Sequence, residues 1–180
     1  MKCAPLTGWV ERGRKYIMTE LWDAYDHYFN KIKGMTLIRD EPFPEGVYHL
    51  LCDVIVKHID GSYLVMQRDF RKHHGGMWEL TAGGCALQGE GPLECAYREL
   101  KEETGLDAGN LEELGRTVQD ECQSLYVEYL WVTDCPKDGI LLQEGETVAY
   151  KWVDRNALLE MSAHDLASNR TVGLIRELGV

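Results

Sequence analysis

The stretch Gly84–Leu106 reads GCALQGEGPLECAYRELKEETGL and decides the fold that we predict for this chain. It opens with a glycine turn, and apolar side chains then recur at helical spacing, which predicts a helix over residues 92–104. Pro92 suits the first turn of a helix, and Gly105 ends it because glycine tolerates a positive φ. The side chains expected to pack inward are Leu93, Ala96, Tyr97, Leu100 and Thr104.

The other side of this helix carries a concentration of acid. Glu99 and Glu103 are four residues apart and share a face, and Glu102 lies beside them. Two carboxylates about 4 Å apart repel by roughly 4 kcal/mol at an effective dielectric near 20. A hard divalent cation would turn that repulsion into attraction, and an all-oxygen ligand set favours Mg²⁺ or Mn²⁺ over zinc. The spacing alone supports a solvated acidic face equally well.

The stretch as a whole resembles the signature of the Nudix hydrolase family. Every fixed position of that signature is present, which makes the match far more specific than a lone glycine motif. The matching residues are Gly84, Glu90, the run 98–104 (RELKEET), Gly105 and Leu106. The resemblance covers about Tyr48–Asp154, so the N-terminal segment is less well covered.

The resemblance implies an α/β (α+β) fold, an α/β/α sandwich in which a mixed β-sheet has a helix on each side. It also implies an Mg²⁺- or Mn²⁺-dependent hydrolase with Glu99, Glu103 and Glu102 as metal ligands. In this family the arginine pairs with the first glutamate of the signature, so Arg98 and Glu90 are expected to orient the ligand loop. Helix spacing by itself would equally allow Arg98 to pair with Glu102 or with the acid at position 94.

A further acid is expected ahead of Trp152, because family members commonly place one there on a loop that reaches the metal. Glu146 is the first choice and Glu144 the reserve, and an exposed acidic loop is the alternative interpretation. A carboxylate would take the proton of the attacking water, with Glu102 and Glu146 as the candidates. The predicted catalytic set is therefore Glu99, Glu102 and Glu146.

Substrate binding is predicted on a basic loop and a glycine pair. Residues 68–76 form the most basic local patch of an acidic chain, where Arg68, Arg71 or Lys72 would meet the substrate's diphosphate as charge-assisted donors. The alternative for this patch is a solvated loop. Gly83 and Gly84 would let the backbone approach the substrate closely.

The remaining chain predicts one compact domain with a β-hairpin ahead of it. Residues 1–44 are interpreted as an arm and hairpin, and residues 45–180 as the Nudix-type domain, while residues 1–18 show no clear pattern. The hairpin strands are predicted at 20–25 and 34–39, with turn residues at 26–33. Further strands are predicted at 48–56, 62–67, 77–80, 111–120 and 124–133, and helical patterns at 156–161, capped by Asp154, and at 165–178.

Composition limits the partners. The 180 residues carry a formal net charge of -11, which would repel a long nucleic acid or an anionic membrane but allows a small nucleotide in a locally basic pocket. No apolar run has the length of a membrane span, and residues 1–15 lack the apolar region of a secretory signal. The six cysteines show no paired metal spacing and indicate reduced thiols in a cytoplasmic protein. By analogy with the family, a homodimer is possible, with the hairpin as its candidate element.

Two other functions share the predicted fold. The hairpin and the region 77–90 also resemble isopentenyl-diphosphate isomerase, but that enzyme needs a catalytic cysteine where this chain has Gly83, and Cys85 falls two residues late. A non-catalytic nucleotide sensor is the third reading, and the intact acid set argues against it. For the hydrolase, the expected substrate is a nucleoside diphosphate joined to another group, with ADP-ribose, nucleoside triphosphates, sugar nucleotides and dinucleotides as candidates.

Overall fold

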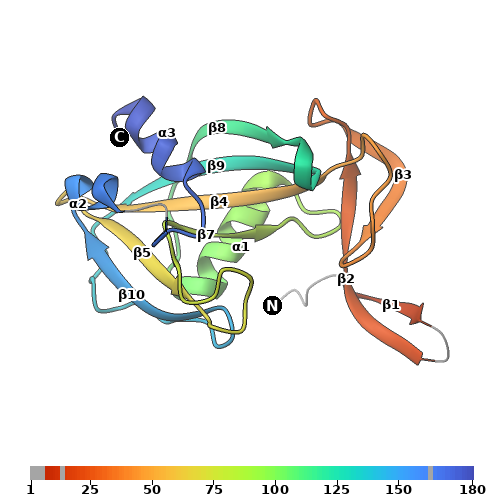
Figure 1. Ribbon diagram of the computed structural model, residues 1–180, viewed down its shortest axis with the longest axis horizontal. Coiled ribbons are helices and arrows are strands. Elements are labelled where there is room, and N and C mark those ends of the chain that lie inside the picture. Colours follow the sequence, from red (N-terminus) through yellow and green to blue (C-terminus); the bar gives the residue numbers. More distant parts are fainter. Residues whose placement is uncertain (1–6, 13–14, 162–163) are drawn as a thin grey trace.

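A computed structural model describes residues 7–12, 15–161 and 164–180, with side chains from residue 19 onward. The elements are shown in Figure 1. In chain order they are β1 (Thr7–Arg12), β2 (Lys15–Tyr25), β3 (Lys31–Ile38), β4 (His49–His58), β5 (Tyr63–Arg68), β6 (Trp78–Glu79), β7 (Thr81–Cys85), α1 (Pro92–Thr104), β8 (Glu112–Gln119), a 3-10 turn (Asp120–Cys122), β9 (Ser124–Thr133), β10 (Thr147–Val153), α2 (Arg155–Glu160) and α3 (Arg170–Leu178).

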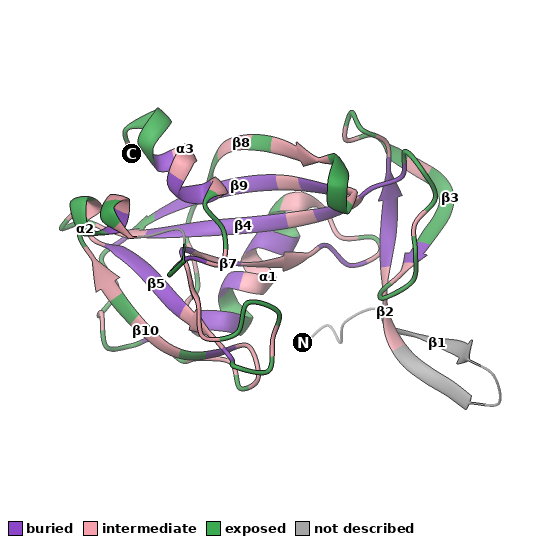
Figure 2. Cartoon of the chain, viewed as in Figure 1, coloured by how far each residue is buried: buried purple, intermediate pink, exposed green. Residues whose placement is uncertain are grey.

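The main sheet is mixed and has helices on both faces. Its strand order is β10-β5-β4-β9-β8, with β6 paired to β5 and β7 paired to β4. β4 runs parallel to β9 and antiparallel to β5 and β7. The near-continuous apolar run of β4 is therefore a central strand buried on both sides, as predicted, and Figure 2 shows the burial along β4, β5 and β9.

Alternation along β4 divides the core into two layers. Leu50, Cys52 and Val54 belong to the cluster that packs against α1, whereas Ile55 belongs to the cluster that packs against α2 and α3. Each fully buried aliphatic side chain contributes about 1.5–3 kcal/mol. The sheet thus holds α1 on one face and α3 on the other, which fits the predicted sandwich.

The N-terminal segment forms a second, three-stranded antiparallel sheet in the order β1-β2-β3. The predicted hairpin corresponds to β2 and β3, but β3 resumes at Lys31, so the turn is shorter than predicted. β1 and the start of β2 lie within residues 1–18, where no element was predicted. β1 pairs with β2 in an antiparallel register that runs from Thr7 opposite Glu20 to Arg12 opposite Lys15. Such backbone pairing needs no periodic apolar pattern.

The second sheet is packed against the start of the signature stretch. Trp22 and Leu37 share a buried cluster with Leu87. The backbone N–H of Gln88 donates to the Leu21 carbonyl at 2.8 Å, and the backbone N–H of Gly89 donates to an Asp23 carboxylate oxygen at 2.7 Å. The loop that leads into Glu90 is therefore held from outside the main sheet.

The signature helix has the predicted bounds, with Gly105 in the left-handed conformation at its C-terminus (φ 74°). Three local expectations were wrong. Gly84 lies in strand β7 rather than in a turn, because β4 is close enough to pair with it. Leu93 is 44% exposed since it lies in the first helical turn, and Cys95 is buried in its place. Helix α3 begins at Arg170, five residues later than the pattern suggested.

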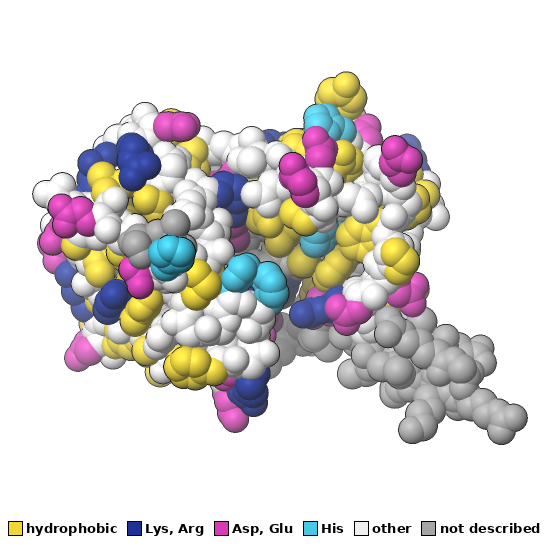
Figure 3. Space-filling model, in the orientation of Figure 1, with side chains coloured by type: hydrophobic (Ala, Val, Ile, Leu, Met, Phe, Trp, Pro, Cys, Tyr) yellow, Lys and Arg dark blue, Asp and Glu magenta, His cyan; other side chains and the backbone are white. Residues whose placement is uncertain are grey.

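Acidic and basic side chains are interspersed over the face seen in Figure 3. Among the described residues, no helix is both long and apolar enough to cross a lipid bilayer. The division into residues 1–44 and 45–180 stays a prediction.

Candidate active site

Two adjacent glycines of β7 separate two cavities. Gly83 and Gly84 point to opposite faces of the strand, as successive residues of a strand do. A Cβ at Gly83 would collide with Asp53 Oδ1, and a Cβ at Gly84 would lie 2.5 Å from Glu99 Oε1. Carboxylates therefore approach this strand from both faces, and they can do so only because neither position carries a side chain.

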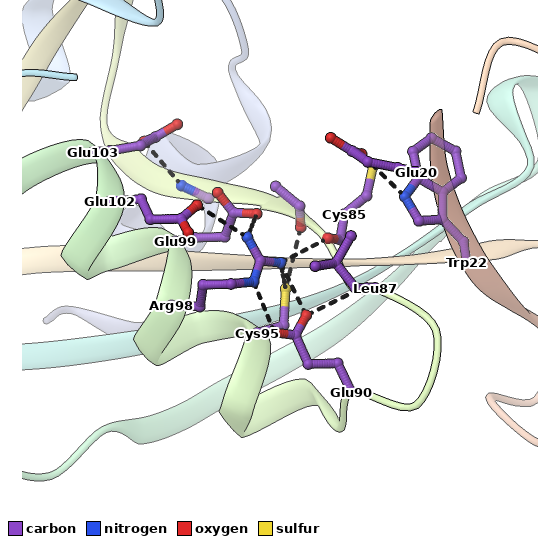
Figure 4. Close-up of polar contacts among 12 residues, drawn as sticks. Glu20, Trp22, Cys85, Leu87, Glu90, Cys95, Arg98, Glu99, Glu102 and Glu103 are labelled. Carbon is purple, nitrogen blue, oxygen red and sulfur yellow. Dashed lines mark hydrogen bonds and ion pairs between the residues drawn. The ribbon is translucent and has the colours of Figure 1, made fainter. Parts of the chain in front are cut away.

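Arg98 ties helix α1 to the loop before it. Its Nε donates to Glu90 Oε1 at 2.7 Å and its Nη2 donates to Glu90 Oε2 at 2.9 Å, a two-point pair. The same Nη2 reaches the Cys85 carbonyl at 3.0 Å, where β7 ends. Figure 4 shows these contacts fanning out from one guanidinium. The geometry agrees with the family-based expectation for Glu90 and Arg98, and a two-point pair is the arrangement that fixes orientation.

The three predicted metal ligands line one cavity but differ in surroundings. Glu99 accepts a hydrogen bond from Arg98 Nη1 at 2.6 Å. Glu102 forms an ion pair with the same nitrogen at 3.3 Å, and 45% of its side chain is exposed. Glu103 is only 4% exposed, and among the described residues it accepts a single hydrogen bond, 3.2 Å from the Gly83 amide. Burial raises the pKa of the Glu99 carboxyl and raises that of Glu103 well above its usual value. The helix face is thus not a solvated one.

The cavity around these acids, which we call the acidic cavity, has a volume of about 220 Å³. Three cations line it, namely Arg39, Lys72 and Arg98, so the carboxylates exceed them by two formal charges. The five carboxylates are Glu20, Glu99, Glu102, Glu103 and Glu146. An unbalanced cluster of this kind is costly without a bound cation.

A divalent metal fits this donor set. The free carboxylate oxygens are hard ligands, and buried Glu103 has too few donors to stabilise its charge. The ligands are not yet arranged as a shell: within the described part of the chain, no three acidic, His or Cys side chains are placed to hold an ion together. Arg98 bridges Glu99 and Glu102, so these carboxylates would have to turn toward an ion.

The predicted loop acid also reaches this cavity. Glu146 lines it together with Gln143 and forms an ion pair with Lys72. Glu144 is not among the residues that line it. Burial lowers the pKa of Lys72, with the neighbouring Arg68 adding to that effect. Of the three cations weighed in the basic loop, Lys72 is therefore the one that faces the acidic cavity.

Arg68 and Arg71 have different positions. Arg68 forms an ion pair with Glu79 and lines the neighbouring cavity. Arg71 is 72% exposed at its side chain and pairs with Asp69 at 2.7 Å, and it lines neither cavity. Arg71 thus differs from Arg68 and Lys72, which each line at least one of the two cavities.

Sequence reasoning missed the contribution of the second sheet. Glu20, Trp22 and Arg39 line the acidic cavity, and Arg39 Nη1 pairs with Glu20 Oε1 at 2.7 Å. These residues lie more than forty positions before Gly84. Their alternation in the hairpin was visible in the sequence, but nothing local indicated which face would meet the signature.

The neighbouring cavity lies on the α3 side of the sheet, and we call it the α3 cavity. Its volume is about 310 Å³, and it shares Lys72 and Gly83 with the acidic cavity. Arg170, the first residue of α3, and Tyr126 of β9 line it. No motif in the sequence pointed to either residue.

Comparisons with known proteins agree with this architecture. A family model described as the NUDIX domain matches residues 48–172. An uncharacterized Nudix hydrolase of Listeria monocytogenes is 34% identical over 88 residues, which span 48% of this chain and 52% of that protein. Another from Listeria innocua is 28% identical over 141 residues, spanning 77% of this chain and 82% of that protein. The match thus spans about half of the first relative.

Solved structures show the same fold. DR0079 from Deinococcus radiodurans superposes with a TM-score of 0.71 at 17% identity, covering 88% of this chain and 98% of that one. The NUDIX domain of Shewanella oneidensis NrtR, complexed with ADP ribose, gives a TM-score of 0.61 at 19% identity, covering 79% and 95%. These likenesses confirm the predicted α/β sandwich.

Proposed function

The chain belongs to the Nudix family, and from this premise we propose that it is an Mg²⁺- or Mn²⁺-dependent hydrolase that cleaves the diphosphate linkage of a nucleoside diphosphate joined to another group. Family membership supports a hydrolase acting on pyrophosphate bonds. The observation that carries the metal dependence is the acidic cavity, with two uncompensated negative charges and buried Glu103 among them.

Glu99, Glu102 and Glu103 would hold the ion, which when bound neutralises phosphoryl charge and activates a water. Arg98 keeps Glu99 oriented through its pair with Glu90. Lys72 lies where it can meet a phosphoryl oxygen once Glu146 releases it. Without side chains, Gly83 and Gly84 let the Asp53 and Glu99 carboxylates lie against β7, and their backbone would approach the diphosphate closely.

Two carboxylates compete for the role of proton acceptor. Glu102 is nearly half exposed and is linked only to Arg98 among the described residues. Glu146 lines the same cavity and forms an ion pair with Lys72. The pH–rate profiles of Glu102→Gln and Glu146→Gln assign the role, because the variant that lacks the acceptor loses the acidic limb of the profile.

The alternatives meet a specific obstacle. At Gly83, where the isomerase carries its cysteine, a Cβ would overlap the Asp53 carboxylate, so no side chain fits there without rearrangement. A sensor would bind nucleotide without turnover.

The deciding experiment incubates the protein with ADP-ribose, sugar nucleotides, nucleoside triphosphates and isopentenyl diphosphate. Each is tested with Mg²⁺, with Mn²⁺ and with chelator, and the products are identified by mass.

Metal-dependent appearance of two phosphorylated products supports the proposal. Isomer interconversion, or binding without any product, overturns it. The small-molecule substrate, the homodimer and the cytoplasmic location expected from the sequence belong to the same proposal and stay predictions.

A further inference from the structure

The α3 cavity lies where the remainder of a diphosphate substrate would extend. It shares Lys72 and Gly83 with the acidic cavity, so the two cavities adjoin at β7 and at the loop that carries Lys72. Its volume of about 310 Å³ falls at the lower end of the roughly 300–1,000 Å³ typical of ligand pockets. A group attached to a phosphate held in the acidic cavity would therefore lie next to it.

The charges of the α3 cavity are already paired. Arg170 forms ion pairs with Asp53 and with Glu128, which is only 1% exposed. Arg68 is paired with Glu79 in the same way. Because both guanidiniums are occupied by buried carboxylates, the cavity has little capacity to hold a second phosphate, and a neutral group suits it better.

Arg170 and Tyr126 lie against one another in the lining of this cavity. The guanidinium carbon of Arg170 lies 3.8 Å from the centroid of the Tyr126 ring, and the two carboxylates fix the guanidinium in that position. Burial raises the pKa of Tyr126 to about 12, so its hydroxyl stays protonated and can donate a hydrogen bond. Planar, rigidly held arginine and aromatic groups are the surfaces on which heteroaromatic rings stack.

The rest of the lining excludes an aliphatic substrate. Thr81, Gln119 and Ser168 add hydrogen-bonding groups to the wall, and only a few aliphatic side chains line it. An apolar chain placed here would leave these groups without partners. A neutral ring with polar edges can offer them hydrogen-bond partners.

We propose that the α3 cavity binds the nucleobase of the substrate, with the Arg170–Tyr126 pair as its stacking wall. This rests on the proposed function, since it concerns the group carried by the same diphosphate. It assigns specificity to α3 and β9, which lie outside the signature stretch.

The test fills the cavity without removing a charge. Ser168 is exposed and lines the cavity, so Ser168→Trp can place an indole in it. Asn169 is also exposed, does not line the cavity and makes no side-chain cap to α3, so Asn169→Trp is the matched control. A third variant, Tyr126→Leu, removes the ring and keeps Arg170 and its carboxylates.

Binding is measured by calorimetry with Mg²⁺, using the α,β-methylene analogues of ADP, CDP, GDP and UDP and, as the ligand without a nucleoside, methylenediphosphonate. At least one nucleotide analogue is expected to bind about tenfold or more tightly than methylenediphosphonate, in line with base stacking. Ser168→Trp and Tyr126→Leu should abolish that difference, and Asn169→Trp should retain it. Equal affinities in the wild type, or a difference that survives Ser168→Trp, overturn the proposal while leaving the metal site intact.

A failure of the proposed function looks different. If methylenediphosphonate itself does not bind with Mg²⁺, the diphosphate site is refuted, and the cavity is tested with the four nucleosides by NMR line broadening. Broadening of at least one nucleoside that is lost in Ser168→Trp and kept in Asn169→Trp supports the nucleobase site. Its absence in the wild type overturns that site too.

Discussion

The acidic cavity and the α3 cavity lie on either side of one strand and share Lys72, yet their electrostatics are opposite. In the acidic cavity the carboxylates exceed the cations by two. The α3 cavity is lined by the cations Arg68, Lys72 and Arg170 and by the acids Asp53 and Glu79. With Glu128, the second partner of Arg170, three carboxylates match these three cations, and each arginine is paired. Excess carboxylate charge favours the binding of a cation, whereas paired side chains are held in place and favour the binding of a neutral group.

Glu103→Gln should produce the largest effect, because it removes a buried charge from the unbalanced cavity and leaves the balanced one untouched. We expect kcat/KM to fall by more than roughly 100-fold, the upper end for residues that merely orient metal ligands. Steady-state kinetics at several Mg²⁺ concentrations measure the loss. Thermal unfolding should show a fold at least as stable as wild type without metal, since the amide needs no counter-ion.

The matched control is Glu112→Gln, an exposed glutamate on β8 that lines neither cavity. It should retain wild-type kcat/KM and metal dependence. Equal activity of Glu103→Gln and Glu112→Gln would remove the ligand role of Glu103.

Arg98→Lys should have the next largest effect. Lysine keeps the positive charge but cannot make the two-point pair with Glu90, so Glu99 loses its fixed orientation. A loss of roughly 10–100-fold in metal affinity or kcat/KM is expected. Arg116→Lys, on an exposed pair with Glu113, serves as the control and should change neither. Wild-type Mg²⁺ affinity in Arg98→Lys would show that charge alone suffices.

The glycine pair permits a direct comparison of the two cavities. In Gly84→Ala the new methyl group presses on Glu99, and in Gly83→Ala it presses on Asp53, the partner of Arg170. Each variant should lose about 1–3 kcal/mol of unfolding free energy through overpacking. Chemical denaturation measures that loss.

The two glycine variants should differ in binding. Gly84→Ala should weaken Mg²⁺ affinity, and Gly83→Ala should weaken the affinity for a nucleotide analogue more than that for methylenediphosphonate. The same binding profile in both variants would show that β7 does not separate two functions.

Part of the acidic cavity was predictable because the signature residues that line it are close in sequence. The helix 92–104, the pairing of Arg98 with Glu90 and the location of Glu146 in the same cavity all followed from the signature or its family resemblance. The burial of Glu103 did not, since helical spacing placed it on the polar side and only the packing against β7 shows it enclosed.

The α3 cavity was not predictable because its residues come from distant parts of the chain. Asp53, Tyr126 and Arg170 meet only through the parallel pairing of β4 with β9 and the packing of α3 on that face. The register that aligns Asp53 with Glu128 depends on a crossover of many residues. The basic loop shows a related limit, because its sequence indicates cations but not which of Arg68, Arg71 and Lys72 lines a cavity.

The smallest effect is absent at neutral pH and concerns stability. His49 begins β4 near the acidic cavity: its Nδ1 is 3.5 Å from Cys85 Sγ, which lines that cavity, and its Nε2 is 2.7 Å from Ser124 Oγ, where β9 begins. Burial lowers the pKa of His49 to about 4, against about 6.5 in an unfolded chain. Between these values the unfolded chain binds a proton that the folded chain does not, so stability falls as pH drops from about 6.5 to about 4 and then levels off.

His49→Gln should remove this part of the pH dependence, because glutamine does not titrate and its amide can still bond Ser124. Urea denaturation at pH 4.5, 5.5, 6.5 and 7.5 gives the unfolding free energy at each pH. Its slope against pH should correspond to up to one fewer proton bound on unfolding in the variant than in the wild type. His73→Gln, at an exposed loop position, is the control and should keep the wild-type slope. If His49→Gln and the wild type lose stability in parallel, a buried neutral His49 is not the source of this pH dependence, and the cause has to lie in another titrating group.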